Sequence, residues 1–290
     1  MFKNFVNEAT LTFNLCTETP LLINSGSGGK IRPGYDMSPV VTRRGDKDTV
    51  YIPGSSIKGV FRTRYEQLLT ALKTTKPCCN VVDQVSRCKS DAKTGSKKYQ
   101  AVCPACRLFG NLSIGSRIQF ADAYPVGEPV LGYRHGVGIS RITGASHPGA
   151  KFDYQMVESG VFQFTITLQN FALYQLRLIL AIIEDINAGL VTFGMGGTRG
   201  NGRLKLNGDV LMKYKRMGDK CDLLTGYFDI DKGGAITSKH ALFGSQCEIT
   251  GLDAILTTIN ITDKAALEAA MRAENARLEE ENSVKSANAV

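Results

Sequence analysis

The sequence predicts an α+β fold of the split βαβ, ferredoxin-like type. Two observations carry this prediction. The expected elements follow the order strand–helix–strand twice, and apolar residues alternate in the expected strands but recur on one face in the expected helices. At 290 residues and 43% hydrophobic content, the chain can bury a substantial core in one or two domains.

The first strand–helix–strand unit occupies the N-terminal part of the chain. Alternating apolar residues predict a strand over residues 11–23, and residues 24–50 are expected to form a long loop. The turn at 51–56 ends in two serines, which predict the N-cap of a helix. The apolar face of that helix is formed by Ile57, Phe61, Tyr65, Leu68 and Leu72. A strand is expected around residues 118–124.

The second unit begins after a polar, glycine-rich segment at 133–156. A strand is predicted at 161–168, a strongly apolar helix at 174–188, and a further strand from Leu204 to Val210. We expect residues 1–262 to form a single domain. Residues 263–290 are expected to form a short helix and a polar tail that is flexible or depends on a partner.

The most distinctive stretch is residues 194–203, the glycine–arginine loop. Five glycines lie between positions 194 and 202, with Arg199 and Arg203 among them. Glycine permits positive φ, consecutive free N–H groups can hold an anion, and arginine adds planar donors. The spacing fits neither a nucleotide P-loop nor a dinucleotide fingerprint. The loop favours the backbone of a nucleic acid, and an ordinary turn between strands is the alternative.

The chain carries excess positive charge. Its formal net charge is +8 and its sequence pI is about 9.0, which favours a polyanionic partner. Residues 54–110 contain eleven lysines and arginines against three acidic residues. No apolar run is long enough to span a bilayer, and the N-terminus lacks a signal-peptide pattern. We therefore expect a cytoplasmic protein that binds RNA or DNA rather than a membrane.

Five of the eight cysteines are concentrated in one segment. They are Cys78, Cys79, Cys88, Cys103 and Cys106. The last two form a CxxC turn, and Cys88 with Cys78 or Cys79 can complete a site of four thiolates, which predicts structural Zn²⁺. The intervening polar segment has few apolar residues to bury, so a metal would supply its stability. A thioredoxin-type redox pair is the less favoured alternative. The other three cysteines are expected to be small buried hydrophobic residues.

Three segments resemble the RAMP superfamily of CRISPR proteins, most closely the backbone subunits of type III (Csm/Cmr-type) effector complexes. They are YIPGSSIKGVFR at 51–62, RLFGN at 107–111 with SRIQFADAY at 116–124, and GMGGTRGNGR at 194–203. A weaker similarity is ISRITG at 139–144, near the start of the family's thumb hairpin. The segments run in family order over about residues 20–210, and the cysteines resemble the family's zinc-knuckle variants.

This resemblance implies a modified ferredoxin-like (RRM-like) core with a zinc-binding insertion at 73–110 and a thumb β-hairpin at 133–156. Subunits of this kind assemble along a CRISPR guide RNA with other RAMP-type subunits and a large subunit, and they cleave captured target RNA beside each thumb. The implied RNA contacts are Ser55, Ser56, Lys58, Arg62, Arg141, Gly196, Gly197, Thr198, Arg199, Gly200 and Arg203. For each basic residue among them, a solvated surface charge is an equally weighted alternative.

The resemblance also implies that Asp36 is catalytic, because the family places an aspartate just before a Ser-Pro-Val run. Here Met37 is inserted between Asp36 and Ser38, which could move the carboxylate. In the implied reaction the RNA 2′-OH attacks its own phosphate and leaves a 2′,3′-cyclic phosphate and a 5′-OH. The carboxylate would act as base or hold a divalent cation such as Mg²⁺. The alternative is that Asp36 is a turn residue.

Other residues and functions are weaker candidates. His135 and His147 lie in the expected thumb without a visible partner, so both are expected to be solvated or to contact RNA. Asp122 is expected to be structural. The alternatives in function are a catalytically silent guide-RNA-binding subunit, a RAMP ribonuclease that processes the CRISPR precursor, and a zinc-stabilised RNA-binding module unrelated to CRISPR.

Overall fold

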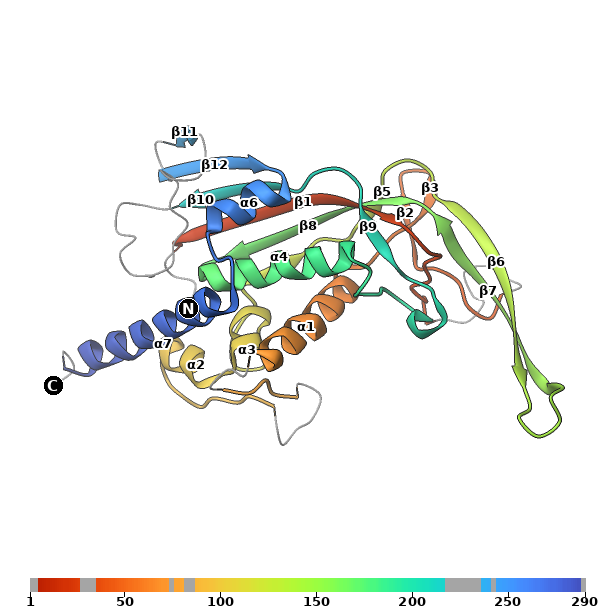
Figure 1. Cartoon of the computed structure of the whole chain (residues 1–290), viewed down its shortest axis with the longest axis horizontal. Coiled ribbons are helices and arrows are strands. Elements are labelled where there is room, and N and C mark those ends of the chain that lie inside the picture. Colours follow the sequence, from red (N-terminus) through yellow and green to blue (C-terminus); the bar gives the residue numbers. More distant parts are fainter. Residues whose placement is uncertain are drawn as a thin grey trace.

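The protein has a mixed α+β architecture built on one large antiparallel sheet (Figure 1). The structure, a computed structural model, describes residues 5–26, 35–72, 76–80, 87–216, 236–240 and 244–287. The sheet order is β11-β12-β10-β1-β8-β4, with β5 beside β8 and β9 beside β1. The strands of this sheet are β1 (Asn7–Thr17), β4 (Ile118–Phe120), β5 (Tyr124–Pro125), β8 (Val161–Gln169), β9 (Leu204–Leu206), β10 (Leu211–Arg216), β11 (Ile236–His240) and β12 (Gly244–Thr250).

Two interleaved βαβ units make up the centre of the sheet. In the first, α1 (Gly54–Ala71) connects β1 to β4, and in the second, α4 (Leu173–Asn187) connects β8 to β10. Strand β8 lies antiparallel between β1 and β4, and β1 lies antiparallel between β8 and β10. The two strands of each unit are therefore separated in the sheet by one strand of the other unit. This order is compatible with the expected ferredoxin-like core.

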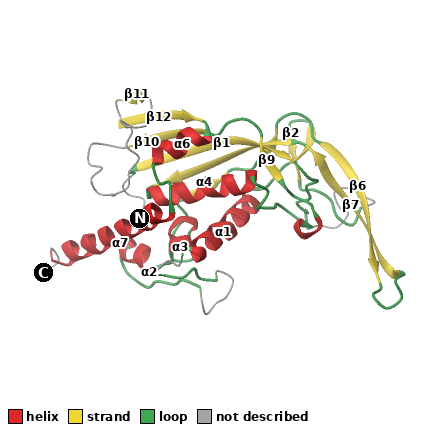
Figure 2. Cartoon of the chain, viewed as in Figure 1, coloured by secondary structure: helices red, strands yellow, loops and turns green. Residues whose placement is uncertain are grey.

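The helices gather on one side of the sheet, as Figure 2 shows. Helix α1 contacts α4, and α6 (Leu252–Ile259) continues this layer beside α4. In β1, alternate residues from Asn7 to Leu15 are buried while those between them are half-buried, which is the pattern of a sheet with one face on the core. Short helices α2 (Gly95–Ala101) and α3 (Pro104–Phe109) lie beside the far end of α1.

A separate sheet of two strands projects from the body as a long hairpin (Figure 1). Its strands are β6 (Val130–Ile139) and β7 (Ser146–Ser159), which pair antiparallel. The hairpin lies where the sequence places the thumb. Large apolar side chains on it are exposed, and Ile142 at the turn is 96% exposed. Burial of apolar side chains does not account for the stability of the projecting hairpin, and its exposed side chains are available to a partner.

The first expected strand is shorter than predicted. Strand β1 ends at Thr17, after which Glu18 and Thr19 both direct their N–H groups to Arg203 O instead of continuing the ladder. Beyond Pro20, Leu21 donates its N–H to Val157 O at 2.8 Å. The expected loop at 24–50 contains a further small hairpin of β2 (Val41–Arg44) and β3 (Lys47–Val50). Strands β11 and β12 were not expected. The helix at 174–188 and the strand at 161–168 are each confirmed to within a residue.

The N-cap prediction for α1 is wrong. The cap position is Pro53, and no side chain of the cap residue bonds the helix. Instead Gly54 donates its N–H to the carboxylate of Asp122 at 2.7 Å, which also places a negative charge at the positive end of the helix. A Cβ at position 54 would lie 2.3 Å from the carbonyl oxygen of Phe120. The glycine of the PGSS turn is therefore required by close contact with β4.

The C-terminal segment forms a longer helix than expected, α7 (Lys264–Ala287). Its Leu267, Met271, Glu274 and Leu278 are buried. This part of the segment, where the sequence predicts a short helix, is therefore packed against the body. The helix then continues to Ala287, over residues that the sequence assigns to the polar tail.

Candidate functional site

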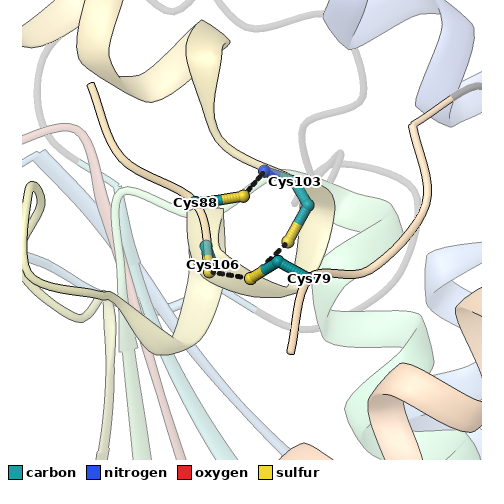
Figure 3. A group of neighbouring side chains, drawn as sticks. All are labelled: Cys79, Cys88, Cys103 and Cys106. Carbon is teal, nitrogen blue, oxygen red and sulfur yellow. Dashed lines mark hydrogen bonds between the residues drawn. The ribbon is translucent and has the colours of Figure 1, made fainter. Parts of the chain in front are cut away.

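Four cysteines converge beside the end of α1 (Figure 3). The sulfurs of Cys79, Cys88, Cys103 and Cys106 all lie within 4.8 Å of one another. The Sγ atom of Cys79 is 3.4 Å from that of Cys106 and 3.8 Å from that of Cys103. Four sulfurs bound at about 2.3 Å to one tetrahedral zinc ion lie about 3.8 Å apart. The donor set and its spacing therefore fit a closed site for a metal such as zinc.

The adjacent Cys78 contacts Cys103 through its thiol but is not one of these four cysteines. Its sulfur faces the carbonyl oxygen of Glu66 on α1 at 4.0 Å, so the geometry favours Cys79 as the fourth ligand. The cysteines in the described part of the chain form no disulfide. Burial raises the pKa of the Cys88 thiol to about 11, and binding of a metal would have to release such thiol protons.

Backbone and side-chain donors surround the cysteine sulfurs. Cys103 donates its N–H to Cys88 Sγ at 3.3 Å, and Arg62 donates from Nη2 to Cys106 Sγ at 3.3 Å. Such donors stabilise thiolates and fix their orientation. Four thiolates around one Zn²⁺ carry a net charge of about −2, so the guanidinium of Arg62 also offsets that charge.

The basic face of α1 is largely engaged inside the protein. Arg62 also contacts Glu66 at 2.8 Å and Gly110 O at 3.1 Å. Lys58 donates to Ser116 Oγ at 3.2 Å, and burial lowers the pKa of its amine. Arg64 pairs with Asp185 on α4 at 2.8 Å. RNA contact by Arg62 and Lys58 stays a prediction, whereas Ser55 at the start of the helix is exposed and Ser56 is half-buried.

The glycine–arginine loop uses most of its N–H groups within the protein. Met195 donates to Leu22 O and Gly202 to Pro20 O, each at 2.8 Å, and Arg199, Gly200 and Asn201 donate within the loop. At Gly202, where φ is +80°, a Cβ would lie 2.0 Å from Phe193 O. In this part of the described chain, the longest run of backbone N–H groups without a backbone acceptor is therefore residues 196–198. The side chains of Arg199 and Arg203 are exposed.

Asp36 lies against the long hairpin. Its backbone N–H donates to Asp153 O at 2.9 Å, and its Oδ2 accepts the N–H of Asp153 at 2.8 Å. The inserted Met37 continues this contact, because Gln155 donates its N–H to Met37 O at 3.0 Å. Tyr35 stacks on Tyr133 of β6 with ring centroids 5.2 Å apart. Asp36 is exposed, and its carboxylate is held at the side of β7.

His135 has a partner that the sequence did not reveal. Its Nδ1 lies 2.7 Å from Asp153 Oδ1 across the hairpin. Hydrogen bonding from His135 lowers the pKa of Asp153. Asp153 is therefore an acceptor and Nδ1 carries the hydrogen. The partners are 18 residues apart in sequence and meet through the β6–β7 register, which could not be fixed before the turn was known. His147 contacts the neighbouring Pro148 O instead.

Arg141 lies at the exposed end of the hairpin, well away from the cysteines (Figure 1). The predicted residues therefore do not form one cluster. Asp36 and Arg141 lie along the hairpin, Arg62 contacts the cysteine cluster from the middle of α1, and a third set belongs to the glycine–arginine loop. A shallow groove of about 370 Å³ between α1 and residues 190–192 leads toward the glycine–arginine loop.

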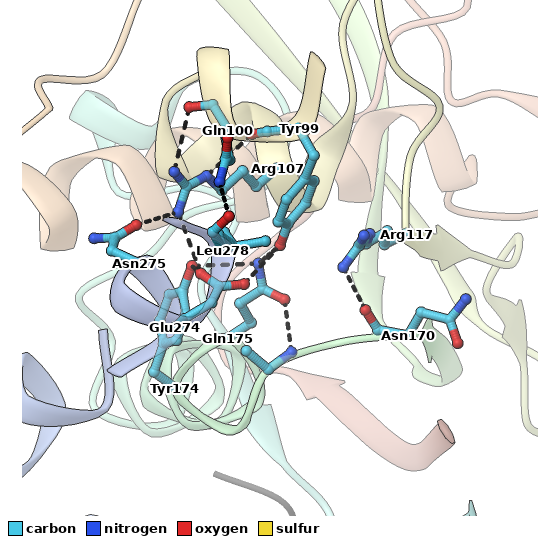
Figure 4. A network of polar contacts seen from close by, with 11 residues as sticks. Tyr99, Gln100, Arg107, Arg117, Asn170, Tyr174, Gln175, Glu274, Asn275 and Leu278 are labelled. Carbon is cyan, nitrogen blue, oxygen red and sulfur yellow. Dashed lines mark hydrogen bonds and ion pairs between the residues drawn. The ribbon is translucent and has the colours of Figure 1, made fainter. Parts of the chain in front are cut away.

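A buried polar network was also missed by sequence reasoning (Figure 4). The carboxylate of Glu274 on α7 accepts the hydroxyls of Tyr99 at 2.8 Å and Tyr174 at 2.9 Å. Arg107 Nη1 lies 3.3 Å from the same carboxylate and donates to Asn275 Oδ1 at 2.7 Å. The signal in the sequence is Glu274 itself, because it lies between Met271 and Leu278 on the apolar face of α7.

Comparison with known proteins places the chain in a family. Curated proteins gave no match to the sequence. In the described part of the chain, no helix is both long and apolar enough to cross a membrane. The family model of the RAMP superfamily, whose members are commonly CRISPR-associated and bind RNA, matches residues 14–205. This range includes α1, the cysteine cluster, the long hairpin and the glycine–arginine loop. The chain belongs to the RAMP superfamily.

Proposed function

We propose that this protein is a backbone subunit of a type III CRISPR effector complex, of the zinc-knuckle variety. It would bind guide RNA beside other RAMP-type subunits and the large subunit, and cleave complementary target RNA. Membership of the RAMP superfamily supports RNA and other CRISPR subunits as partners. Among the exposed apolar side chains of the long hairpin, Tyr133 suits stacking on bases, and Val137 and Ile142 suit insertion between them.

The position of Asp36 carries the proposal of cleavage. Asp36 is exposed and is held against β7 by two hydrogen bonds with Asp153, of which one is accepted by its carboxylate and the other is donated by its backbone N–H. A fixed carboxylate beside a hairpin that enters the RNA can accept the 2′-OH proton of a nearby nucleotide. Attack of that oxygen on phosphorus then gives a 2′,3′-cyclic phosphate and a 5′-OH.

Among the described residues, fewer protein ligands are present for the divalent cation expected in the cleavage reaction than for zinc at the cysteines. In the described part of the chain, the four cysteines are the only group of three or more potential ligands at bonding distance. Mg²⁺ is usually bound by one or two carboxylates together with substrate phosphates, so an ion at Asp36 would be held in part by the RNA. A Zn²⁺ ion at the cysteines would be structural, since a site closed by four thiolates has no open position for substrate.

The test is cleavage of target RNA by the assembled complex with Asp36→Asn. We expect cleavage at the positions of this subunit to fall by about 10²-fold or more, with assembly and guide binding unchanged. Asp209→Asn, at an exposed aspartate between β9 and β10, is the matched control. Unchanged cleavage by Asp36→Asn would overturn the assignment of Asp36. Absence of cleavage at these positions by the wild-type complex would favour a catalytically silent subunit. Cutting of repeat RNA by the isolated protein would favour the precursor-processing ribonuclease.

A further inference from the structure

One residue of the long hairpin links a histidine to the proposed catalytic carboxylate. Asp153 Oδ1 accepts from His135 Nδ1 at 2.7 Å, and Asp153 N–H donates to Asp36 Oδ2 at 2.8 Å. Asp153 thereby fixes both groups, one through its side chain and one through its backbone. Both therefore border the same part of the hairpin surface.

The strand register defines which side chains share that surface. His135 is opposite Asp153, and Val137 is opposite Lys151, so these alternate residues lie on one face of the hairpin. The charged groups on this face near His135 are Asp153 and Lys151 on β7, while Asp36 is bonded to the backbone of Asp153 along the other edge of β7. The ion pair of Arg134 and Glu158 belongs to the other face. The His135 side chain is 70% exposed, so the ring is accessible to an RNA that lies along the hairpin.

The contact with Asp153 determines which ring nitrogen can act. Because Nδ1 donates to the carboxylate, Nε2 is the nitrogen that can exchange a proton with a bound molecule. No hydrogen bond to Nε2 occurs within the described residues. A carboxylate at Nδ1 also fixes the tautomer and the orientation of the ring, as in catalytic histidine–aspartate pairs.

We propose that His135 is the general acid of the cleavage reaction proposed for Asp36; this inference rests on that proposed function. Asp36 takes the proton of the 2′-OH, and the 2′-oxygen forms a bond to phosphorus. The bond from phosphorus to the 5′-oxygen breaks, and that oxygen takes the proton from His135 Nε2. The products are the 2′,3′-cyclic phosphate and the free 5′-OH, with no change in oxidation state. Water returns the proton from Asp36 to His135.

The inference is tested with two target RNAs in single-turnover reactions of the assembled complex. One RNA is unmodified, and the other carries sulfur in place of the 5′-bridging oxygen at the cleaved bond. A thiolate leaves without protonation, so this RNA does not need a general acid. We expect His135→Gln to cleave the unmodified RNA about 10²–10⁴-fold more slowly than wild type, and the sulfur-containing RNA at nearly the wild-type rate. His147→Gln, on the same hairpin, should retain the wild-type ratio between the two RNAs.

The same experiment includes the outcomes that overturn the inference. Equal losses on both RNAs would show that His135 orders the site or binds RNA, and no loss on either would show that it is not used. Asp36→Asn should be slow on both RNAs, because the base is still required. If Asp36→Asn cleaves both RNAs at the wild-type rate, the proposed function itself fails, whatever the His135 result. Thermal unfolding of His135→Gln checks that this exposed substitution leaves the fold intact.

Discussion

Substitution of Glu274 should release the C-terminal helix from the body of the protein. The carboxylate is 2% exposed, and it accepts two tyrosine hydroxyls and contacts the buried guanidinium of Arg107 (Figure 4). Glu274→Gln keeps the size of the side chain but removes its charge. Arg107 then remains buried with a neutral partner, a change that costs about 3–5 kcal/mol in comparable buried pairs.

Hydrogen exchange of the α7 amides measures this cost directly. Because each 1.4 kcal/mol is a factor of about ten, docking weakened by about 3–5 kcal/mol should speed exchange across residues 264–278 by roughly 100-fold to 4,000-fold. Glu268→Gln is the matched control on the same helix. Its partners are the exposed Lys264 and Arg272, and surface pairs of this kind contribute about 1 kcal/mol or less.

A double-mutant cycle separates the ion pair from the rest of the network. Arg107→Met removes the buried positive charge, so combining it with Glu274→Gln should cost less than the sum of the two single changes. Exchange of α7 accelerated less than tenfold by Glu274→Gln, together with additive effects in the cycle, would refute the view that this network holds the helix.

Two further predictions follow from the buried groups. Cys79→Ser should abolish stoichiometric zinc in the purified protein, measured by mass spectrometry of the metal, whereas Cys78→Ser should retain it. The reason is that Cys79, and not Cys78, belongs to the group of four with Cys88, Cys103 and Cys106. Retention of zinc by Cys79→Ser would contradict this assignment. Burial raises the pKa of Tyr99 from 10.0 to about 12. The stabilising contribution of Tyr99 is therefore complete below pH 10 and lost as the pH rises from 10 to 12. Urea unfolding over this range should show that loss in the wild type and a smaller one in Tyr99→Phe.

The elements with strong periodicity could be predicted from sequence, because their pattern is local. The apolar face of α1 and the alternation of β8 each report burial against one surface. Strands β11 and β12 add to the sheet beyond β10, and nothing in their own residues specifies that partner. The serine cap failed for a similar reason. The group that caps α1 is Asp122, which is 68 residues away from Gly54 and reaches it only through the packing of β4.

The cysteine cluster could be predicted because the ligand spacing is itself the signal. The choice between Cys78 and Cys79 could not, since adjacent residues differ only in which way the backbone turns them. For the glycine–arginine loop, by contrast, the sequence could not distinguish anion binding from close packing. Glycines that bind an anion and glycines that permit close packing have the same composition, and at Gly194 and Gly202 the close contacts of the backbone with Leu22 and Phe193 decide for packing.

The RLFGN segment joins two parts of the structure that the sheet does not connect. Cys106 belongs to the cysteine cluster, and the next residue, Arg107, contacts Glu274 of α7. Arg62 extends the connection to α1 through Cys106 Sγ. Helix α3 is six residues long, too short to be stable alone, so its position depends on these contacts. If the cysteines hold the proposed zinc ion, its removal should therefore first free α3 and α7 and only later affect the sheet, whose core lies between β1, β8 and α4.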